Sequence, residues 1–155
     1  MKLLFLALAA AVTGYRSWTP LTPEPKQMSY AQSAMCMSPG PSQGPHADRW
    51  AMVYANRIAT GAAKEFPVGS ILVKEKRLKR DDAKPEGVAY MIKHGKGKFA
   101  KSGGWEFGYV PSGKQASTAH CVNCHKSSFA TDYVFTSVTR SAGVPPAPAG
   151  RLARQ

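Results

Sequence analysis

The segment Cys121–His125 carries the clearest chemistry in the sequence, because two cysteines separated by two residues are followed at once by a histidine. A Cys-x-x-Cys-His segment is typical of c-type haem attachment, in which both thiols form thioethers with the haem vinyl groups. The adjacent histidine can then bind the iron from the proximal side. We therefore predict one covalent haem c per chain, held by Cys121 and Cys124, with His125 as the iron ligand.

Two other kinds of site also use a Cys-x-x-Cys pair. A thioredoxin-like disulfide needs a surrounding βαβ pattern, which the sequence lacks. A zinc site needs further ligands, and there is no second Cys-x-x-Cys pair. Haem attachment is therefore the favoured interpretation. It leaves Cys36 as an odd thiol, either a small buried side chain or a partner in an intermolecular disulfide.

The place of the motif limits the sixth iron ligand. Residues 126–155 contain neither His nor Met, so no residue after the motif supplies the methionine ligand of small electron-transfer cytochromes. Either an upstream residue fills the distal position or that position is open. An open iron site binds small molecules as well as exchanging electrons.

The chain has 155 residues, a length that suits one domain. Its formal net charge of +12 suggests attraction to acidic partners or anionic surfaces. No nucleic-acid motif accompanies the charge, so we expect no nucleic acid as a partner. One stretch is especially basic. It is either a solvated face or a docking surface for an acidic redox partner, and its members are Lys74, Lys76, Arg77, Lys79, Arg80 and Lys84.

The ends of the chain differ in composition from the middle. Lys2 and the apolar run that follows it predict a signal peptide over residues 1–14, with an uncleaved N-terminal anchor as the alternative. Export to the periplasm agrees with the haem motif. We expect an irregular, proline-rich lead-in over 15–45, a haem domain over 46–140, and a disordered basic tail over 141–155.

Alternating apolar and polar residues predict four strands within the haem domain, over 50–55, 70–75, 87–93 and 105–110. A short helix over 57–65, a turn at 66–69 and a short closing element over 131–138 complete the pattern. The sequence lacks four long stretches of helical period, which excludes a four-helix bundle. The predicted fold class is α+β, mainly an antiparallel sheet with short helices, with the haem held near the C-terminal end.

Four ordered segments resemble the cytochrome P-460 family over roughly residues 44–138, and they are Phe66–Glu75, Gly104–Phe107, Cys121–Lys126 and Thr131–Thr136. The resemblance implies a largely antiparallel sheet, a homodimer, a periplasmic location and a five-coordinate haem with an open distal pocket. The best-known members of the cytochrome P-460 family oxidise hydroxylamine. The related cytochrome c′-beta branch instead binds nitric oxide and carbon monoxide without enzymatic turnover.

The resemblance also assigns roles to particular residues. Lys74 matches a lysine that the hydroxylamine-oxidising members bond covalently to the haem macrocycle. Trp105 and Phe107 are candidates for packing against the haem, although aromatic strand residues often belong to the core. The match of Lys74 to the cross-linking lysine favours an oxidoreductase that acts on a small nitrogen-containing substrate.

One departure from the family pattern points the other way. The hydroxylamine-oxidising members place a carboxylate at a distal position that aligns here with Tyr90, or with Ala89, and residues 87–104 contain no Asp or Glu. A tyrosine, with a pKa of about 10, is a poor proton acceptor near neutrality. A general base contributes about 10²–10⁴-fold to rate. The missing carboxylate therefore favours the non-enzymatic binding of nitric oxide or carbon monoxide.

Overall fold

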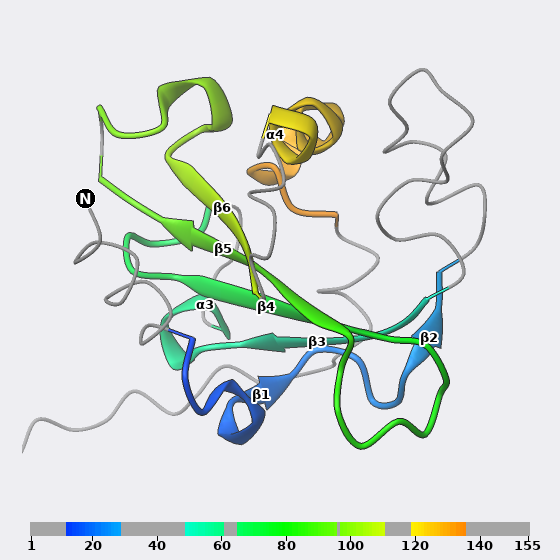
Figure 1. Cartoon of the computed structure of the whole chain (residues 1–155). Helices are drawn as coiled ribbons and strands as arrows, with labels where there is room; N and C mark the ends of the chain where they lie inside the picture. Colours follow the sequence, from blue (N-terminus) through cyan, green and yellow to red (C-terminus); the bar gives the residue numbers. More distant parts are fainter. Residues whose placement is uncertain (1–11, 29–48, 61–64, 96, 111–118, 136–155) are drawn as a thin grey trace, which may run out of the picture.

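A computed structural model describes residues 12–28, 49–60, 65–95, 97–110 and 119–135 (Figure 1). Its centre is a six-stranded antiparallel sheet in the order β1-β3-β4-β5-β6, with β2 also pairing β3. The strands are β1 (Thr19–Pro20), β2 (Lys26–Gln27), β3 (Trp50–Ala55), β4 (Ile71–Arg77), β5 (Gly87–Lys93) and β6 (Trp105–Val110). This architecture confirms the predicted fold class.

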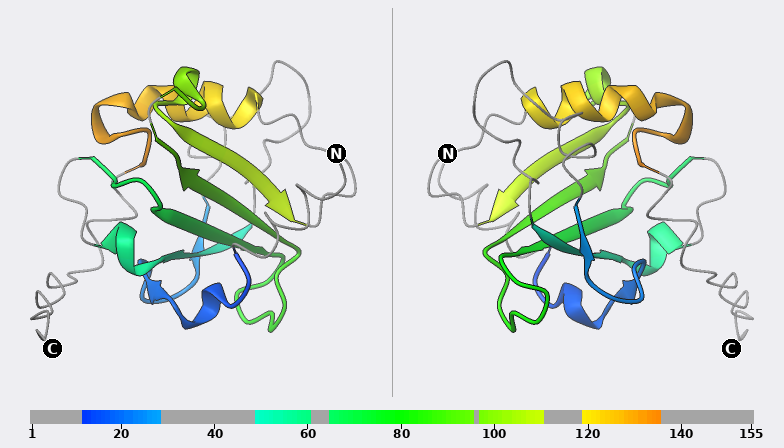
Figure 2. Two further views of the ribbon diagram at one scale, coloured as in Figure 1. Left: turned by 90° about the vertical axis from the view of Figure 1, so that its left-hand side faces the viewer. Right: turned by 90° about the vertical axis from the view of Figure 1, so that its right-hand side faces the viewer.

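The remaining elements are short. Within the described residues these are the α-helices α3 (Arg57–Thr60) and α4 (Ala119–His125) and the 3₁₀ helices η1 (Tyr15–Ser17), η2 (Ala100–Ser102) and η3 (Lys126–Thr131). Figure 2 shows α4 and η3 lying across one face of the sheet, with η1 on the other side. None of the described helices is long and apolar enough to cross a bilayer.

The predicted strand positions agree closely with the sheet. The bounds of β3, β5 and β6 are those expected, while β4 begins at Ile71 and extends to Arg77. The turn before β4 has Gly69 at φ 89°, which a glycine adopts readily. Helix α3 is described over Arg57–Thr60, the predicted continuation through residues 61–64 lies outside the described part, and Glu65, the predicted last residue, is not helical.

The N-terminal lead-in is more regular than predicted. Thr19 and Pro20 pair with Ala55 and Tyr54, and Lys26 and Gln27 pair with Ala51 and Trp50, so β1 and β2 both add to the edge of β3. Strands of two residues carry too little alternation to be recognised in a sequence. Several predicted features lie outside the described residues, namely most of the signal segment, Cys36, residues 136–138 of the closing element and the C-terminal tail.

Side-chain alternation gives the sheet two different faces. The face covered by α4, here called the α4 face, carries Leu72, Lys74 and Lys76 of β4. Its core cluster consists of Leu21, Val53, Ala55, Ala59, Leu72, Met91, Trp105, Phe107 and Val134. The opposite face packs a second cluster of Val12, Tyr54, Val73 and Tyr90 against the segment around η1.

The basic run does not form one solvated face. Lys74 and Lys76 point to the α4 face and Arg77 to the opposite face, where it binds the fully buried Glu75. Lys79 and Arg80 lie in the exposed hairpin between β4 and β5. Because a strand sends successive side chains to opposite faces, a charge run that continues through β4 is divided between two environments.

Candidate functional site

Helix α4 lays the Cys-x-x-Cys-His motif against the sheet. Cys121 and Val122 pack on the core cluster of the α4 face, and Cys124 is buried. Cys121 is a free thiol, and burial raises its pKa despite a backbone hydrogen bond and the charge of Lys76. Cys124 is disulfide-bonded in this structure, so thioether formation at Cys124 first requires reduction of that bond.

His125 has the chemistry of an iron ligand. Its Nδ1 lies 2.6 Å from the carbonyl oxygen of Tyr133. A carbonyl only accepts hydrogen bonds, so Nδ1 carries the proton and Nε2 keeps a free lone pair. Burial lowers the pKa of His125, as does the charge of Lys74, while the bond to Tyr133 opposes them. The residue is thus held as a neutral imidazole of the correct tautomer, which fits a haem.

Lys74 lies on the same face as this imidazole. It is in β4, an inner strand, where it pairs with Val53 on one side and Ala89 on the other. Burial, together with the smaller effect of the nearby charge of Lys76, lowers the pKa of its amine to about 8. Around neutral pH part of the Lys74 population therefore has a free, nucleophilic amine.

Tyr90 lies on the opposite face from Lys74 and His125. Its ring packs over Gly108, where an added Cβ would be 2.1 Å from the Tyr90 ring, and it belongs to the second core cluster. Burial raises its pKa, which makes it a still weaker base. Since a shift of one residue moves a strand side chain to the other face, the aligned position on the α4 face is Ala89, directly opposite Lys74 and Tyr109.

The two aromatic candidates have different surroundings. Phe107 lies with its ring centroid 4.9 Å from that of His125, so it touches the predicted iron ligand. Trp105 is completely buried, packs edge-to-face on Phe66 at 5.4 Å, and donates from Nε1 to the carbonyl oxygen of Asp132 at 2.8 Å. Trp105 therefore anchors the segment that follows η3.

Sequence reasoning missed several residues near the site. Asp132 binds Lys93, Trp105 and the backbone of Phe66, and the Lys76 amine lies 4.4 Å from the centre of the Tyr109 ring. Met91 is buried in the cluster of the α4 face. No sequence signal marks Met91 or Tyr109. Asp132 could have been suspected because it lies within the family-like segment Thr131–Thr136.

The strands of the α4 face supply amines and no carboxylate among the described residues. Their charged side chains are Lys26, Lys74, Lys76 and Lys93, and the position opposite Lys74 on β5 is an alanine. The acidic group beside this face, Asp132, is engaged by Lys93 at 2.6 Å. A carboxylate that could accept a proton is therefore missing from the described strands of this face.

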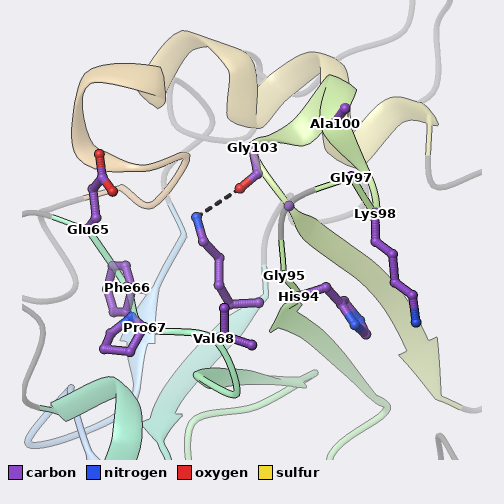
Figure 3. Close-up of a pocket in the computed structure, with 12 residues that line it drawn as sticks. Glu65, Phe66, Pro67, Val68, His94, Gly95, Gly97, Lys98, Ala100 and Gly103 are labelled. Atoms are coloured by element: carbon purple, nitrogen blue, oxygen red, sulfur yellow. Dashed lines mark hydrogen bonds between the residues drawn. The ribbon is translucent and has the colours of Figure 1, made fainter.

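A cavity of about 590 Å³ lies elsewhere, between the 65–68 turn and the loop that follows β5 (Figure 3). Lys93 donates to the carbonyl oxygen of Gly103 at 2.8 Å within it, and His94 pairs with Glu106 at 2.6 Å. No residue of α4 lines this cavity. Lys93 and His94 both have hydrogen-bond partners here. Because the motif lies on α4, this cavity is not the site that the motif predicts.

Comparison with known proteins agrees with this site. No curated protein matches the chain. The model of the cytochrome P-460 family matches residues 12–136, a range that begins well before residue 46 and includes η1, β1 and β2. With the motif helix on an antiparallel sheet and a histidine prepared for iron, the chain belongs to the cytochrome P-460 family and is a haem cytochrome.

Proposed function

We propose that this chain is a periplasmic mono-haem c-type cytochrome whose iron has an open distal position for small nitrogen species. Cys121 and Cys124 would hold the haem by thioethers, and His125 would bind the iron through Nε2. The free lone pair on Nε2, set by the bond from Nδ1 to Tyr133, supports this ligand assignment. When bound, the haem supplies an iron that coordinates small ligands and exchanges electrons.

The function that the geometry supports best is binding of nitric oxide or carbon monoxide, with slow or absent hydroxylamine oxidation. The observation that carries it is Ala89, a side chain without a proton acceptor, at the position facing Lys74. Ligand binding needs only a vacant site, whereas oxidation also requires protons to be taken up near the reacting atoms.

Hydroxylamine oxidation is the second candidate, and Lys74 is the observation that favours it. Its amine lies on the α4 face with a pKa of about 8, and such an amine is a nucleophile in its neutral form. The same value means that most of the amine is protonated at pH 7. Lys74 would therefore accept a proton efficiently only above about pH 8.

The test is an absorption spectrum and a turnover assay on the haem-loaded protein. We expect a five-coordinate spectrum, carbon monoxide binding after reduction, and little hydroxylamine consumption. A six-coordinate spectrum that excludes carbon monoxide would contradict the open site. In that case Met91→Leu, in which a residue of similar volume lacks the sulfur, would show whether Met91 is the ligand. Rapid turnover at pH 7 would instead support the oxidoreductase.

The location and the partners are part of the proposal. The N-terminal apolar run supports export, and the net charge of +12 supports an acidic redox partner. Family membership supports a homodimer. Fractionation of expressing cells and sedimentation of the purified holoprotein test the location and the oligomeric state.

A further inference from the structure

The segment that follows η3 contains an unusual pair of backbone conformations. Asp132 and Tyr133 both have positive φ, at 53° and 63°. Asparagine and aspartate tolerate this left-handed region, but a tyrosine adopts it rarely. Such strain persists where the surroundings over-determine it, and it is concentrated at functional sites.

Asp132 is held in this conformation from three directions. Its carboxylate accepts from the Lys93 amine at 2.6 Å and from the backbone nitrogen of Phe66 at 2.8 Å. Its carbonyl oxygen accepts from Trp105 Nε1 at 2.8 Å. Lys93 and Trp105 face each other in register across β5 and β6, so Asp132 is tied to a rigid part of the sheet.

The next residue connects this network to the iron ligand. The Tyr133 ring lies against Gly103, where an added Cβ would be 2.4 Å from it. The Tyr133 nitrogen donates to the carbonyl oxygen of Ser128 at 2.8 Å. With both ends fixed, the Tyr133 carbonyl is directed at His125 Nδ1 at 2.6 Å.

From this chain of contacts we infer that Asp132 is a positioning residue for the iron ligand: with Lys93 and Trp105 it holds the turn that aims the Tyr133 carbonyl at His125 Nδ1. The bond from Nδ1 orients the ring and makes it a stronger electron donor. A stronger donor stabilises the oxidised metal, so the network lowers the reduction potential of the haem. The inference rests on the proposed function, because it requires His125 to be the ligand.

The experiment compares haem-loaded variants by potentiometry and by resonance Raman spectroscopy of the reduced iron–histidine stretch. Asp132→Asn keeps the tolerance for positive φ and removes the charge that Lys93 binds. We expect a positive shift of the midpoint potential equivalent to about a tenfold change in the redox equilibrium, which is about 59 mV for a one-electron couple. The iron–histidine stretch should move to lower frequency.

A second variant and a control separate positioning from stability. Lys93→Met removes the cation and keeps a chain of similar length, so it should shift the potential in the same direction even if Asp132→Asn does not fold. Glu75→Gln makes the same acid-to-amide change in a buried network on the opposite face, and it should leave the potential unchanged.

The outcomes distinguish this inference from the proposed function. If Asp132→Asn and Lys93→Met carry haem but shift the potential no more than Glu75→Gln, the inference is overturned and the proposed function stands. If the unmodified protein never attaches haem covalently, the proposed function fails and the inference fails with it.

Discussion

At the scale of single residues, the described strands of the α4 face carry lysine amines and no carboxylate. Lys74 and Lys76 are two residues apart on one strand and therefore share a face. Burial and the charge of Lys76 lower the pKa of Lys74 to about 8. The nucleophilic form of Lys74 is thus accessible near physiological pH.

The first prediction concerns covalent attachment of Lys74 to the haem. We expect Lys74→Met to convert a red-shifted Soret band into an ordinary c-type band, because the side chain loses the only atom that can bond to the macrocycle. Mass spectrometry of haem peptides should show the Lys74 peptide attached in the unmodified protein. Lys79→Met, which changes an exposed lysine of the hairpin between β4 and β5, is the control, and it should leave both results unchanged. A Lys74 peptide that always runs free would contradict this prediction and would leave the proposed binding of nitric oxide and carbon monoxide intact.

The second prediction concerns the position facing Lys74. Ala89→Glu places a carboxylate on the α4 face and should raise the rate of hydroxylamine oxidation by roughly 10² or more, the usual contribution of a positioned base. Tyr90→Glu is the matched control, because it adds the same group to the other face of the same strand. Steady-state assays compare the two. Equal rates in both variants would show that the strand register does not decide access to the iron.

At the scale of elements, the N-terminal segment is tied to β4 through one buried carboxylate. Glu75 is fully buried and accepts from Tyr15 Oη at 2.7 Å and from Arg16 Nε at 2.6 Å, with Arg77 as a further partner. Burial alone would raise the pKa of Glu75, but these hydrogen bonds outweigh it and lower the pKa. The network therefore stabilises the packing of η1 on the opposite face.

The third prediction follows from this lowered pKa. The ionised Glu75 contributes stability above its unfolded pKa of about 4.5, and that contribution is lost as the pH falls through the folded value. Glu75→Gln should lower the free energy of unfolding by roughly 1–3 kcal/mol at pH 7. Its deficit should shrink towards pH 3. Urea titrations at both pH values measure the difference, and a deficit independent of pH would rule out the ionised carboxylate as its cause.

At the scale of the whole molecule, the charge is strongly positive, and the exposed lysines occur at both ends of the fold. Lys126, the first residue of η3, directly follows His125 at the end of α4, whereas Lys79 lies in the hairpin between β4 and β5. Figure 1 shows these two segments on opposite sides of the sheet. The rate of electron transfer to a partner that docks near the haem should therefore depend more on Lys126 than on Lys79.

The fourth prediction uses this asymmetry. Electron transfer to an acidic redox protein should slow as the ionic strength rises from about 0.01 M to 0.15 M, because the Debye length falls from about 30 Å to about 8 Å. At low salt, Lys126→Glu should slow the reaction several-fold more than Lys79→Glu. Stopped-flow measurements on the reduced holoprotein give both rates. Identical rates in the two variants would place the docking surface away from α4.

Much of the fold follows directly from the sequence. The strands β3, β5 and β6 were predictable because each is a run of six or seven residues with alternating or β-favouring side chains bounded by turn residues. The strands β1 and β2 were not predictable, since their pairing depends on the edge of β3. The sequence also did not show that the basic run is divided between the two faces of the sheet, because that division depends on how far β4 extends through the run.

The sequence by itself determined the parts of the site whose geometry is local. The spacing from Cys121 to His125 fixes three groups on one helical segment, so the cofactor chemistry could be inferred without knowing any distant contact. Tertiary structure decided what surrounds that segment. It placed Ala89 and not Tyr90 opposite Lys74, and it joined Asp132 to Lys93 and Trp105. Those relations depend on strand register and long-range packing, which set the face of each side chain and cannot be derived from neighbours in the sequence.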